Sequence, residues 1–588
     1  MTQRDAIHGL LGRWSVGLMV SVVFASGLAS TLPAAGDTGP WEALDMAMKE
    51  LRACEAEHRA CNAAVEAYRQ ALAAARPAAL ADAQRAVDEA EKALADAEKA
   101  AGLEGAREKL QQSRQARDAK VEQLLADAPT FQEAVKRRDE MQKRIGQLQQ
   151  RIAELNLEEL LELGRLSLEE RALGKHIAGS QRAWWKRGEV EPLYRAADAD
   201  YKAYGAAAGK APAVKEAGEK IKAARKALDD AIATLPLDSA AGKALLEHQA
   251  AAETKVVQAK ARVSELEKLL IGGAKTVTVT MRAFDRKAKQ EVDKKISLWV
   301  PPNCDYIRGV IVAHPMISSL ATGQPMRLAA ARTALATMVY DNFANDGKES
   351  LARLDGVLEK LAAESGHPEL RGAPLLLGGL SASVLGTRNV ACAVPHRVFG
   401  IVHAAGGNMQ EMPDDGRGMV QVPFLAHNGE FEWCGPIGGI RPEYGNQTQW
   451  VMIREQMLRL WRDRHEHRMT LVVVPNADHG AWDVGLTALF VRKAAEYRLP
   501  TEKRDGTTPA VCRPLPVEKG WLTDADLDHP THEPAPYGSY KGDKNNAFWH
   551  FDEEMARAVY EYHKGRFLLP DPTKTHPVPA DWPPGRAK

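Results

Sequence analysis

The stretch PLLLGGLSAS at residues 374–383 is the clearest indication of fold in the second half of this chain. Its apolar opening predicts a short buried strand, its centre is a glycine-rich turn, and a helix-prone segment follows at once. A strand, a tight turn and a helix around a small-X-Ser-X-small pattern are typical of a nucleophile elbow. Gly379 and Ser383 are the small residues around Ser381. Ser381 is therefore the candidate nucleophile, because choosing Ser383 would put Leu385 at the second small position.

A general base must activate a serine hydroxyl, and a histidine loop later in the chain offers one. Residues 471–474 form an apolar run that predicts a buried strand, and His479 follows it in a loop that ends at Gly480. A surface histidine would fit the same loop. Its place after Ser381 in chain order favours His479 as the base.

The acid of such a site is expected between the serine and the histidine in chain order. The loop after the apolar run 422–426 carries two carboxylates, Glu430 and Glu432. We prefer Glu432, which lies three residues beyond Gly429, and we keep Glu430 as the alternative. The acid would hold the imidazole in one tautomer and stabilise the imidazolium that forms.

Acyl transfer also needs hydrogen-bond donors for an oxyanion. The backbone N–H of Ala382, next to the nucleophile, is one candidate. The loop after the apolar run 309–313 offers the other, and because Pro315 has no N–H the candidate is Met316. His314 in the same loop is expected at the substrate edge as a loop-ordering residue.

Two tryptophans follow the proposed acid and base closely. Trp433 and Trp482 could form the floor of a pocket for an aromatic acyl group or a sugar. Packing in the core is the alternative for both.

Apolar strand-like runs alternate with helical stretches through the second half of the chain. This order predicts a mostly parallel sheet covered by helices on both faces, with an antiparallel edge formed by the first two strands. The predicted strands are 276–280, 296–300, 309–313, 374–377, 398–404, 422–426 and 471–474, and the predicted helices are 324–344, 348–365, 384–394 and 448–464. We assign this domain to residues 275–500 and a Pro-rich C-terminal extension that packs on it to residues 501–588.

The first half favours helix from residue 41 to residue 271. Ala, Glu, Lys, Gln, Arg and Leu dominate it, and these residues are good helix formers. One apolar seam has heptad spacing, as in a coiled coil: Met141, Ile145, Leu148, Ile152 and Leu155. Prolines and glycines interrupt the pattern, so we expect several long antiparallel helices or a broken coiled coil. We expect this helical half of the chain to serve in spacing, oligomerisation or docking.

The N-terminal residues 1–35 are typical of a secretory signal. Arg4 and Arg13 precede an apolar run, 14–29, and small residues follow it. An uncleaved N-terminal anchor is the alternative, and only that alternative would hold the chain at a membrane. The sequence thus predicts export, to a periplasm or beyond.

Composition excludes some classes of function. Lys and Arg number 78 and Asp and Glu number 78, so the formal net charge is zero, which argues against a chain built to bind nucleic acid. The six cysteines are too few for a dense disulfide framework, and those of the second half show no metal-ligand spacing. No metal site is predicted.

The region from residue 276 to residue 499 resembles the α/β-hydrolase superfamily. The matching motifs are the His314-Pro315 loop, the elbow at 379–383, the acid loop at 428–430 and the base loop at 477–480. It is more similar to secreted bacterial esterases of the feruloyl-esterase and polyester-depolymerase kind than to lipases. The resemblance implies hydrolysis of carboxylic esters through an acyl-enzyme, without a cofactor, on polymer- or glycan-linked esters.

Three residues depart from the superfamily pattern. Ser383 and Pro315 stand where glycine is commoner, and the acid is Glu where Asp is usual. The helical first half lies outside the resemblance.

Two other hypotheses stay open. A peptidase or amidase could use the same triad. A non-catalytic envelope protein could keep the fold as a binding module and act through the coiled-coil region. Self-association of the chain through the coiled-coil region is a further possibility.

Overall fold

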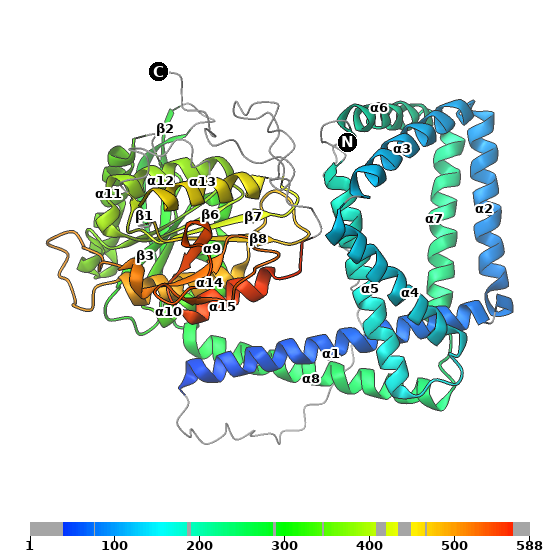
Figure 1. The fold of residues 1–588 in the computed structure, drawn as a ribbon, viewed down its shortest axis with the longest axis horizontal. Helices are drawn as coiled ribbons and strands as arrows, with labels where there is room; N and C mark the ends of the chain where they lie inside the picture. Colours follow the sequence, from blue (N-terminus) through cyan, green and yellow to red (C-terminus); the bar gives the residue numbers. More distant parts are fainter. Residues whose placement is uncertain are drawn as a thin grey trace.

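The computed structural model describes residues 39–75, 77–126, 128–184, 190–285, 290–343, 346–406, 419–432, 449–464 and 467–567. The predicted signal segment 1–35 lies outside these ranges. Within them, no helix is both long enough and apolar enough to cross a membrane. The described chain forms a helical region and a sheet domain that lie side by side (Figure 1).

The predicted all-α region is present, and its helices run in pairs. They are α1 (Pro40–Ala75), α2 (Ala81–Ala100), α3 (Glu104–Leu125), α4 (Pro129–Gln150), α5 (Leu157–Trp184), α6 (Glu191–Ala208), α7 (Pro212–Ala233) and α8 (Ala240–Ile271). Helix α1 lies along α8, α2 along α7, α3 along α6 and α4 along α5, and together the pairs outline a closed frame (Figure 1). We call residues 40–271 the helical frame.

The apolar seam with heptad spacing is divided between a helix and a turn. Helix α4 ends at Gln150, and residues 151–154 form a turn. Ile152 and Leu155 therefore lie beyond the helix, yet both are buried, in a cluster with Leu160 and Leu163 of α5. Four of the five seam residues are buried and Ile145 is partly buried, but the heptad spacing continued past the point where the helix ends.

The sheet domain contains a mostly parallel eight-stranded sheet. Its strands are β1 (Lys275–Asp285), β2 (Gln290–Val300), β3 (Gly309–Ala313), β4 (Leu335–Val339), β5 (Leu375–Leu380), β6 (Val398–Ala404), β7 (Phe424–Gly429) and β8 (Met469–Val474). They lie in the order β1-β2-β4-β3-β5-β6-β7-β8. Strand β2 is antiparallel to β1 and to β4, and the others are parallel to their neighbours.

One predicted helix is wrong. Residues 324–344 were expected to be helical throughout, but helix α10 ends at Arg332 and strand β4 follows at Leu335. Ala334 has φ of 56°, a left-handed turn that no helix continues through. The apolar run 335–339 then pairs with β3 inside the sheet. Pairing and burial there outweigh the helix propensity of its alanine and methionine.

Helices cover both faces of the sheet. One face carries α11 (Gly347–Ser365), α12 (Val384–Ala393) and α13 (Gln449–Arg464), and the other carries α9 (Ser319–Thr322), α10 (Gln324–Arg332) and α14 (Val484–Arg498). Alternate residues of β3 show the division, because Val310 and Val312 join the first core cluster and Ile311 and Ala313 join the second. Short 3₁₀ helices lie at Pro77–Leu80, Pro315–Ile317, Pro368–Leu370, Ser381–Ser383, Pro395–Arg397, Val517–Lys519 and Lys544–Asn546.

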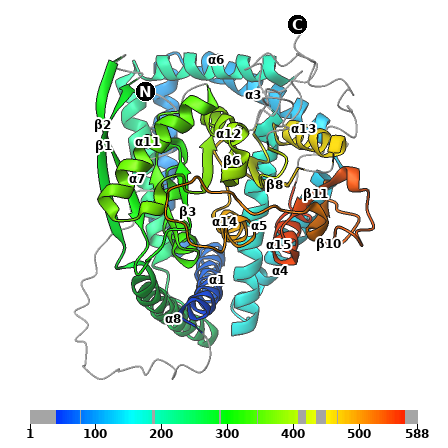
Figure 2. The same ribbon diagram turned by 90° about the vertical axis from the view of Figure 1, so that its left-hand side faces the viewer.

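The C-terminal extension covers the β8 edge of the sheet. It contains a small sheet in the order β10-β9-β11, from β9 (Trp521–Asp524), β10 (Ala535–Pro536) and β11 (Ala547–His550), and helix α15 (Glu553–His563). Val473 of β8 donates its N–H to His563 Nε2 at 3.0 Å, and Thr470 Oγ1 donates to the Trp549 carbonyl at 2.8 Å. The extension thus satisfies polar groups of an edge strand. Figure 2 shows it on the side opposite the β1–β2 edge.

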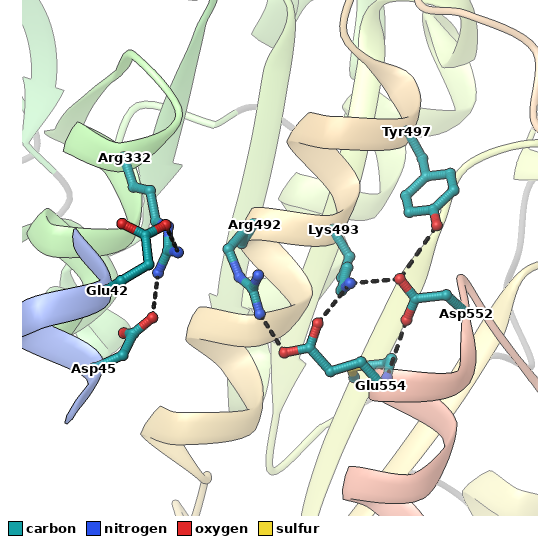
Figure 3. A network of polar contacts seen from close by, with 9 residues as sticks. Glu42, Asp45, Arg332, Arg492, Lys493, Tyr497, Asp552 and Glu554 are labelled. Carbon is teal, nitrogen blue, oxygen red and sulfur yellow. Dashed lines mark hydrogen bonds and ion pairs between the residues drawn. The ribbon is translucent and has the colours of Figure 1, made fainter. Parts of the chain in front are cut away.

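Two groups of ion pairs join these parts (Figure 3). Lys493 of α14 contacts Asp552 at 2.5 Å and Glu554 at 2.7 Å, which fixes the extension to the sheet domain. Arg332 of α10 contacts Asp45 of α1 at 2.8 Å. The Arg332–Asp45 pair joins the base of the helical frame to the sheet domain, next to the point where α8 leads into β1.

Candidate active site

The elbow places Ser381 at the carboxyl end of β5, before helix α12. Ser381 has φ of 54°, in the left-handed region that L-residues rarely adopt. A Cβ added to Gly379 would lie 2.9 Å from Thr387 Oγ1 and 2.9 Å from Val384 Cα. Only glycine fits there, which is the steric demand that the small-X-Ser-X-small pattern implied.

Ser383, the other serine of the turn, has a structural role. Its Oγ accepts a hydrogen bond from the Leu380 N–H and donates one to the Leu380 carbonyl, both at 2.8 Å. These two bonds close the elbow. Ser383 is therefore occupied within the turn, while the Ser381 Oγ faces His479.

The structure brings Ser381, His479 and Glu432 together from the ends of three strands. His479 Nε2 lies 3.2 Å from Ser381 Oγ, and His479 Nδ1 lies 2.7 Å from Glu432 Oε1. A carboxylate can only accept, so Nδ1–H donates to Glu432 and Nε2 is left to accept the serine proton. This is the arrangement that a general base needs.

Glu432 is buried and held from several sides. Its side chain is 1% exposed, and its Oε2 accepts from Asn428 Nδ2 at 3.1 Å and from the Gly429 N–H at 3.3 Å. Burial raises the pKa of Glu432 above its ordinary value, and hydrogen bonds from His479, Asn428 and Gly429 oppose that rise. His479 itself is 54% exposed at the side chain, so a substrate can reach it from solvent.

Glu430, the competing carboxylate, points away from His479. Its Oε2 accepts from His176 Nε2 at 2.6 Å and from the Asn476 N–H at 2.8 Å. The structure therefore brings Glu432, and not Glu430, into contact with His479.

A glycine allows the acid loop and the base loop to touch. A Cβ on Gly429 would lie 2.4 Å from the Ala477 carbonyl oxygen and 2.6 Å from that of Asp478. The Phe431 N–H also donates to the Ala477 carbonyl at 2.8 Å. The loops that carry Glu432 and His479 are thus in direct backbone contact.

The two predicted oxyanion donors belong to the elbow itself and to the loop that follows β3. Strand β3 pairs with β5, and the His314 N–H donates to the Gly378 carbonyl at 2.9 Å, which places His314 beside the carboxyl end of β5, the strand that leads into Ser381. The Met316 N–H donates to His314 Nδ1 at 3.2 Å. His314 is thus bound within its own loop, as a loop-ordering residue would be. Ala382 directly follows Ser381 on the exposed side of the elbow.

Of the two tryptophans that could form the pocket floor, the structure describes only Trp482. Trp482 packs against the apolar cluster of α14 and lies edge-on to His427, with ring centroids 6.5 Å apart. Trp433 lies outside the described residues, as do all of 407–418 and 433–448.

Three histidines around the site were not predicted by any sequence motif. His403 and His427 are fully buried beneath it, where they contact the hydroxyls of Thr387 and Thr487, each at 3.0 Å. Burial lowers the pKa of both to about 3, so both imidazoles are neutral. His176 comes from the helical frame, more than 250 positions before its partner Glu430. Only the tertiary structure brings it there.

Within the described ranges, no group of three or more His, Cys, Asp or Glu side chains is placed to hold a metal ion. What the site offers chemically is a hydroxyl, an oriented imidazole and a buried carboxylate in one chain of hydrogen bonds.

No protein-family model matches this sequence, and no curated protein sequence matches it. Among solved structures, a cold-adapted esterase from an Arctic intertidal metagenomic library is similar, with 15% identity, a TM-score of 0.25, and coverage of 38% of this chain and 95% of that one. An S-formylglutathione hydrolase from Agrobacterium tumefaciens has the same four values. A ferulic acid esterase is similar with 11% identity, a TM-score of 0.25, and coverage of 38% of this chain and 98% of its own.

Proposed function

We propose that this chain is a serine hydrolase of the α/β-hydrolase class that cleaves carboxylic esters. One observation carries the proposal: Ser381, His479 and Glu432 form a continuous hydrogen-bonded chain, with steps of 3.2 Å and 2.7 Å. They come from the ends of β5, β8 and β7, in the chain order Ser, Glu, His.

The geometry supports a two-step reaction. In the first step the Ser381 Oγ attacks the ester carbonyl carbon while His479 Nε2 takes the hydroxyl proton. The tetrahedral intermediate collapses, His479 returns the proton to the departing alcohol, and an acyl-serine remains. In the second step water attacks the acyl carbon, with His479 again as base, and the acid product and the Ser381 hydroxyl are released. Glu432 stays ionised and stabilises the imidazolium in both steps.

The proposed oxyanion donors are the N–H groups of Ala382 and Met316. Ala382 needs no rearrangement beyond the elbow itself. The Met316 N–H would turn from His314 Nδ1 to the oxyanion, so the 3.2 Å bond between them would be exchanged for a charge-assisted one.

We propose esters on a polymer or a glycan as the substrate class, and export as the location. The support is the half-exposed imidazole of His479, which a bulky substrate can reach, together with the signal-like residues 1–35 and the resemblance of the sequence to secreted esterases. Trp482 and Trp433 are the proposed aromatic contacts of the acyl or sugar group.

Hydrolysis of p-nitrophenyl acetate by purified protein tests the reaction class. We expect turnover by the wild-type chain, a loss of at least about 10³-fold in kcat for Ser381→Ala, and unchanged turnover for Ser297→Ala, which alters an exposed serine of β2. Turnover of an anilide at a rate similar to the ester would favour the amidase alternative. Equal activity of Ser381→Ala and the wild type would refute the proposed nucleophile.

A further inference from the structure

Helix α5 of the helical frame lies against the two loops that carry the acid and the base. Figure 1 shows α4 and α5 as the side of the frame that faces the sheet domain, level with β7 and β8. The contacts come from one face of α5, around His176 and Gly179, and they meet the acid loop at 430–431 and the base loop at Asn476.

The polar contact joins α5 to both loops through one carboxylate oxygen. Glu430 Oε2 accepts from His176 Nε2 at 2.6 Å and from the Asn476 N–H at 2.8 Å. The Glu430 side chain is fully buried and that of His176 is 13% exposed. A buried carboxylate needs its donors, so loss of His176 would leave Glu430 with a weakened set of partners.

The packing contact is close, because a glycine of α5 lies directly against both loops. A Cβ on Gly179 would lie 2.5 Å from Phe431 Cε2 and 2.8 Å from Asn476 Oδ1. The His176 and Phe431 rings also lie against each other, with centroids 5.8 Å apart. Glycine at position 179 lets the α5 backbone approach both loops.

These contacts are close to the catalytic groups along the chain. Glu430 lies two residues before Glu432, and Asn476 lies three residues before His479. The loops are short and bound to each other, through Gly429 and through the bond from Phe431 N–H to Ala477. A displacement of Glu430 or Asn476 would therefore move Glu432 relative to His479.

The frame is fixed to the sheet domain at a second point, which makes it a brace. At its base, α8 runs into β1 after three residues, and α1 is held to α10 by the 2.8 Å contact of Arg332 with Asp45. Helix α5 packs on α1 through the apolar cluster that includes Tyr68 and Leu163. Helix α5 is thus connected to the sheet domain a second time, through α1 and α10, in addition to its own contact with the two loops.

We propose that α5 is part of the active-site support, with His176 and Gly179 as positioning residues that hold the Glu432 loop and the His479 loop in register. This inference rests on the proposed function of the triad. It assigns the helical frame a role in catalysis in addition to any role in spacing or docking.

The test compares His176→Ala, His176→Gln and Gly179→Ala in the full chain, with p-nitrophenyl acetate as substrate. We expect His176→Ala to lower kcat by about ten- to a hundredfold with KM within twofold, because misplacement of a catalytic group by about 1 Å costs rate on that scale. His176→Gln keeps a donor that can reach Glu430, so we expect kcat within about threefold of the wild type. Gly179→Ala should resemble His176→Ala.

Two matched controls lie elsewhere in the frame. His248 of α8 makes a similar pair with Glu57, at 3.4 Å, and Gly218 of α7 has open space where a Cβ would lie. His248→Ala and Gly218→Ala should leave kcat and KM unchanged. A kcat of His176→Ala and Gly179→Ala equal to that of the controls would overturn the inference, even with an active wild type.

Amide hydrogen exchange gives a readout that does not need turnover. The N–H groups of Phe431 and Glu432 donate to Ala477 and Gly429 at 2.8 Å and 3.1 Å, and both should exchange at least about tenfold faster in His176→Ala. An inactive wild type would refute the proposed function. In that case unchanged exchange at these two amides would separately refute the positioning role of His176.

Discussion

At the scale of single residues, Glu430 and Glu432 show how one loop can hold two buried carboxylates with different tasks. They lie two positions apart, but Glu432 faces His479 and Glu430 faces His176. The sequence analysis put both carboxylates in the loop that follows β7, and it preferred Glu432 as the acid because of its spacing from Gly429. It could not show what Glu430 does, because its partner lies on a helix in the other half of the chain.

The two glutamates should respond differently to the same substitution. In Glu432→Gln the side-chain amide can turn its NH₂ toward His479 Nδ1, which favours the wrong tautomer, and we expect kcat to fall by about 10³- to 10⁴-fold. In Glu430→Gln we expect a loss of about tenfold, through displacement of the loop alone. Steady-state kinetics on p-nitrophenyl acetate measures both. A larger loss for Glu430→Gln than for Glu432→Gln would assign the acid to Glu430.

Gly429 is the residue at which the acid loop and the base loop depend on each other. Its replacement by alanine puts a Cβ within 2.4 Å of the Ala477 carbonyl oxygen, and neither backbone can move without moving Glu432 or His479. We expect Gly429→Ala to lose most activity and about 1–3 kcal/mol of unfolding free energy. Gly105→Ala, in open space on α3, is the matched control for urea unfolding and kinetics. Normal activity in Gly429→Ala would show that the two loops can separate enough to admit a Cβ without displacing Glu432 or His479.

At the scale of elements, alternation and spacing predicted the sheet better than the helices around it. The strands that carry the site were predicted because each is a short apolar run that ends at a turn, as β5 does before Ser381. Strand β4 was missed because Leu335–Val339 follows helix-prone alanines with only a two-residue turn between. The C-terminal extension was expected to pack on the sheet domain, but its contact with β8 depends on side chains such as His563, which no local pattern marks.

The cover over the β8 edge gives a prediction about His563. Its replacement by alanine leaves the buried Val473 N–H without its acceptor and opens a cavity, so we expect a loss of about 2–4 kcal/mol of unfolding free energy. His529→Ala, at a half-exposed histidine of the same extension, should change stability by less than about 0.5 kcal/mol. Equal urea midpoints for the two variants would contradict the edge contact.

At the scale of the whole molecule, the helical frame and the sheet domain meet at two places. One is the base, where α8 leads into β1 and Arg332 contacts Asp45, and the other is α5 on the acid loop. Sequence patterns predicted the helical region and its breaks at prolines, but they missed the turn at 151–154 that ends α4. They could not give the closure of the frame or the contact of α5 with the site, because both depend on residues more than a hundred positions apart.

Four buried histidines link the stability of the sheet domain to pH. Burial lowers the pKa of His403, His427, His550 and His563 to about 3. An unfolded histidine has a pKa of about 6.5, so below that pH the unfolded chain binds more protons than the folded one. Their contribution is therefore complete above about pH 6.5 and is lost as the pH falls toward 3.

This loss should be visible in mildly acidic buffer. Below the unfolded pKa, each buried histidine lowers the unfolding free energy by up to about 1.4 kcal/mol for each unit by which the pH falls. The raised pKa of Glu432 has the opposite effect and offsets only part of this loss. We expect the unfolding free energy to fall by several kcal/mol between pH 7.5 and pH 5.0, measured by urea unfolding. Equal stability at the two values would mean that these imidazoles are not buried as neutral groups.

Labelling with a fluorophosphonate probe shows whether Ser381 is an activated nucleophile, because such a probe reacts with a serine only where a base activates it. The tryptic peptide 372–388 contains both Ser381 and Ser383, and fragmentation can distinguish them. We expect one adduct per chain, on Ser381, absent from Ser381→Ala and much slower to form in His479→Ala. An adduct on another residue, or none on a folded wild-type chain, would contradict this expectation.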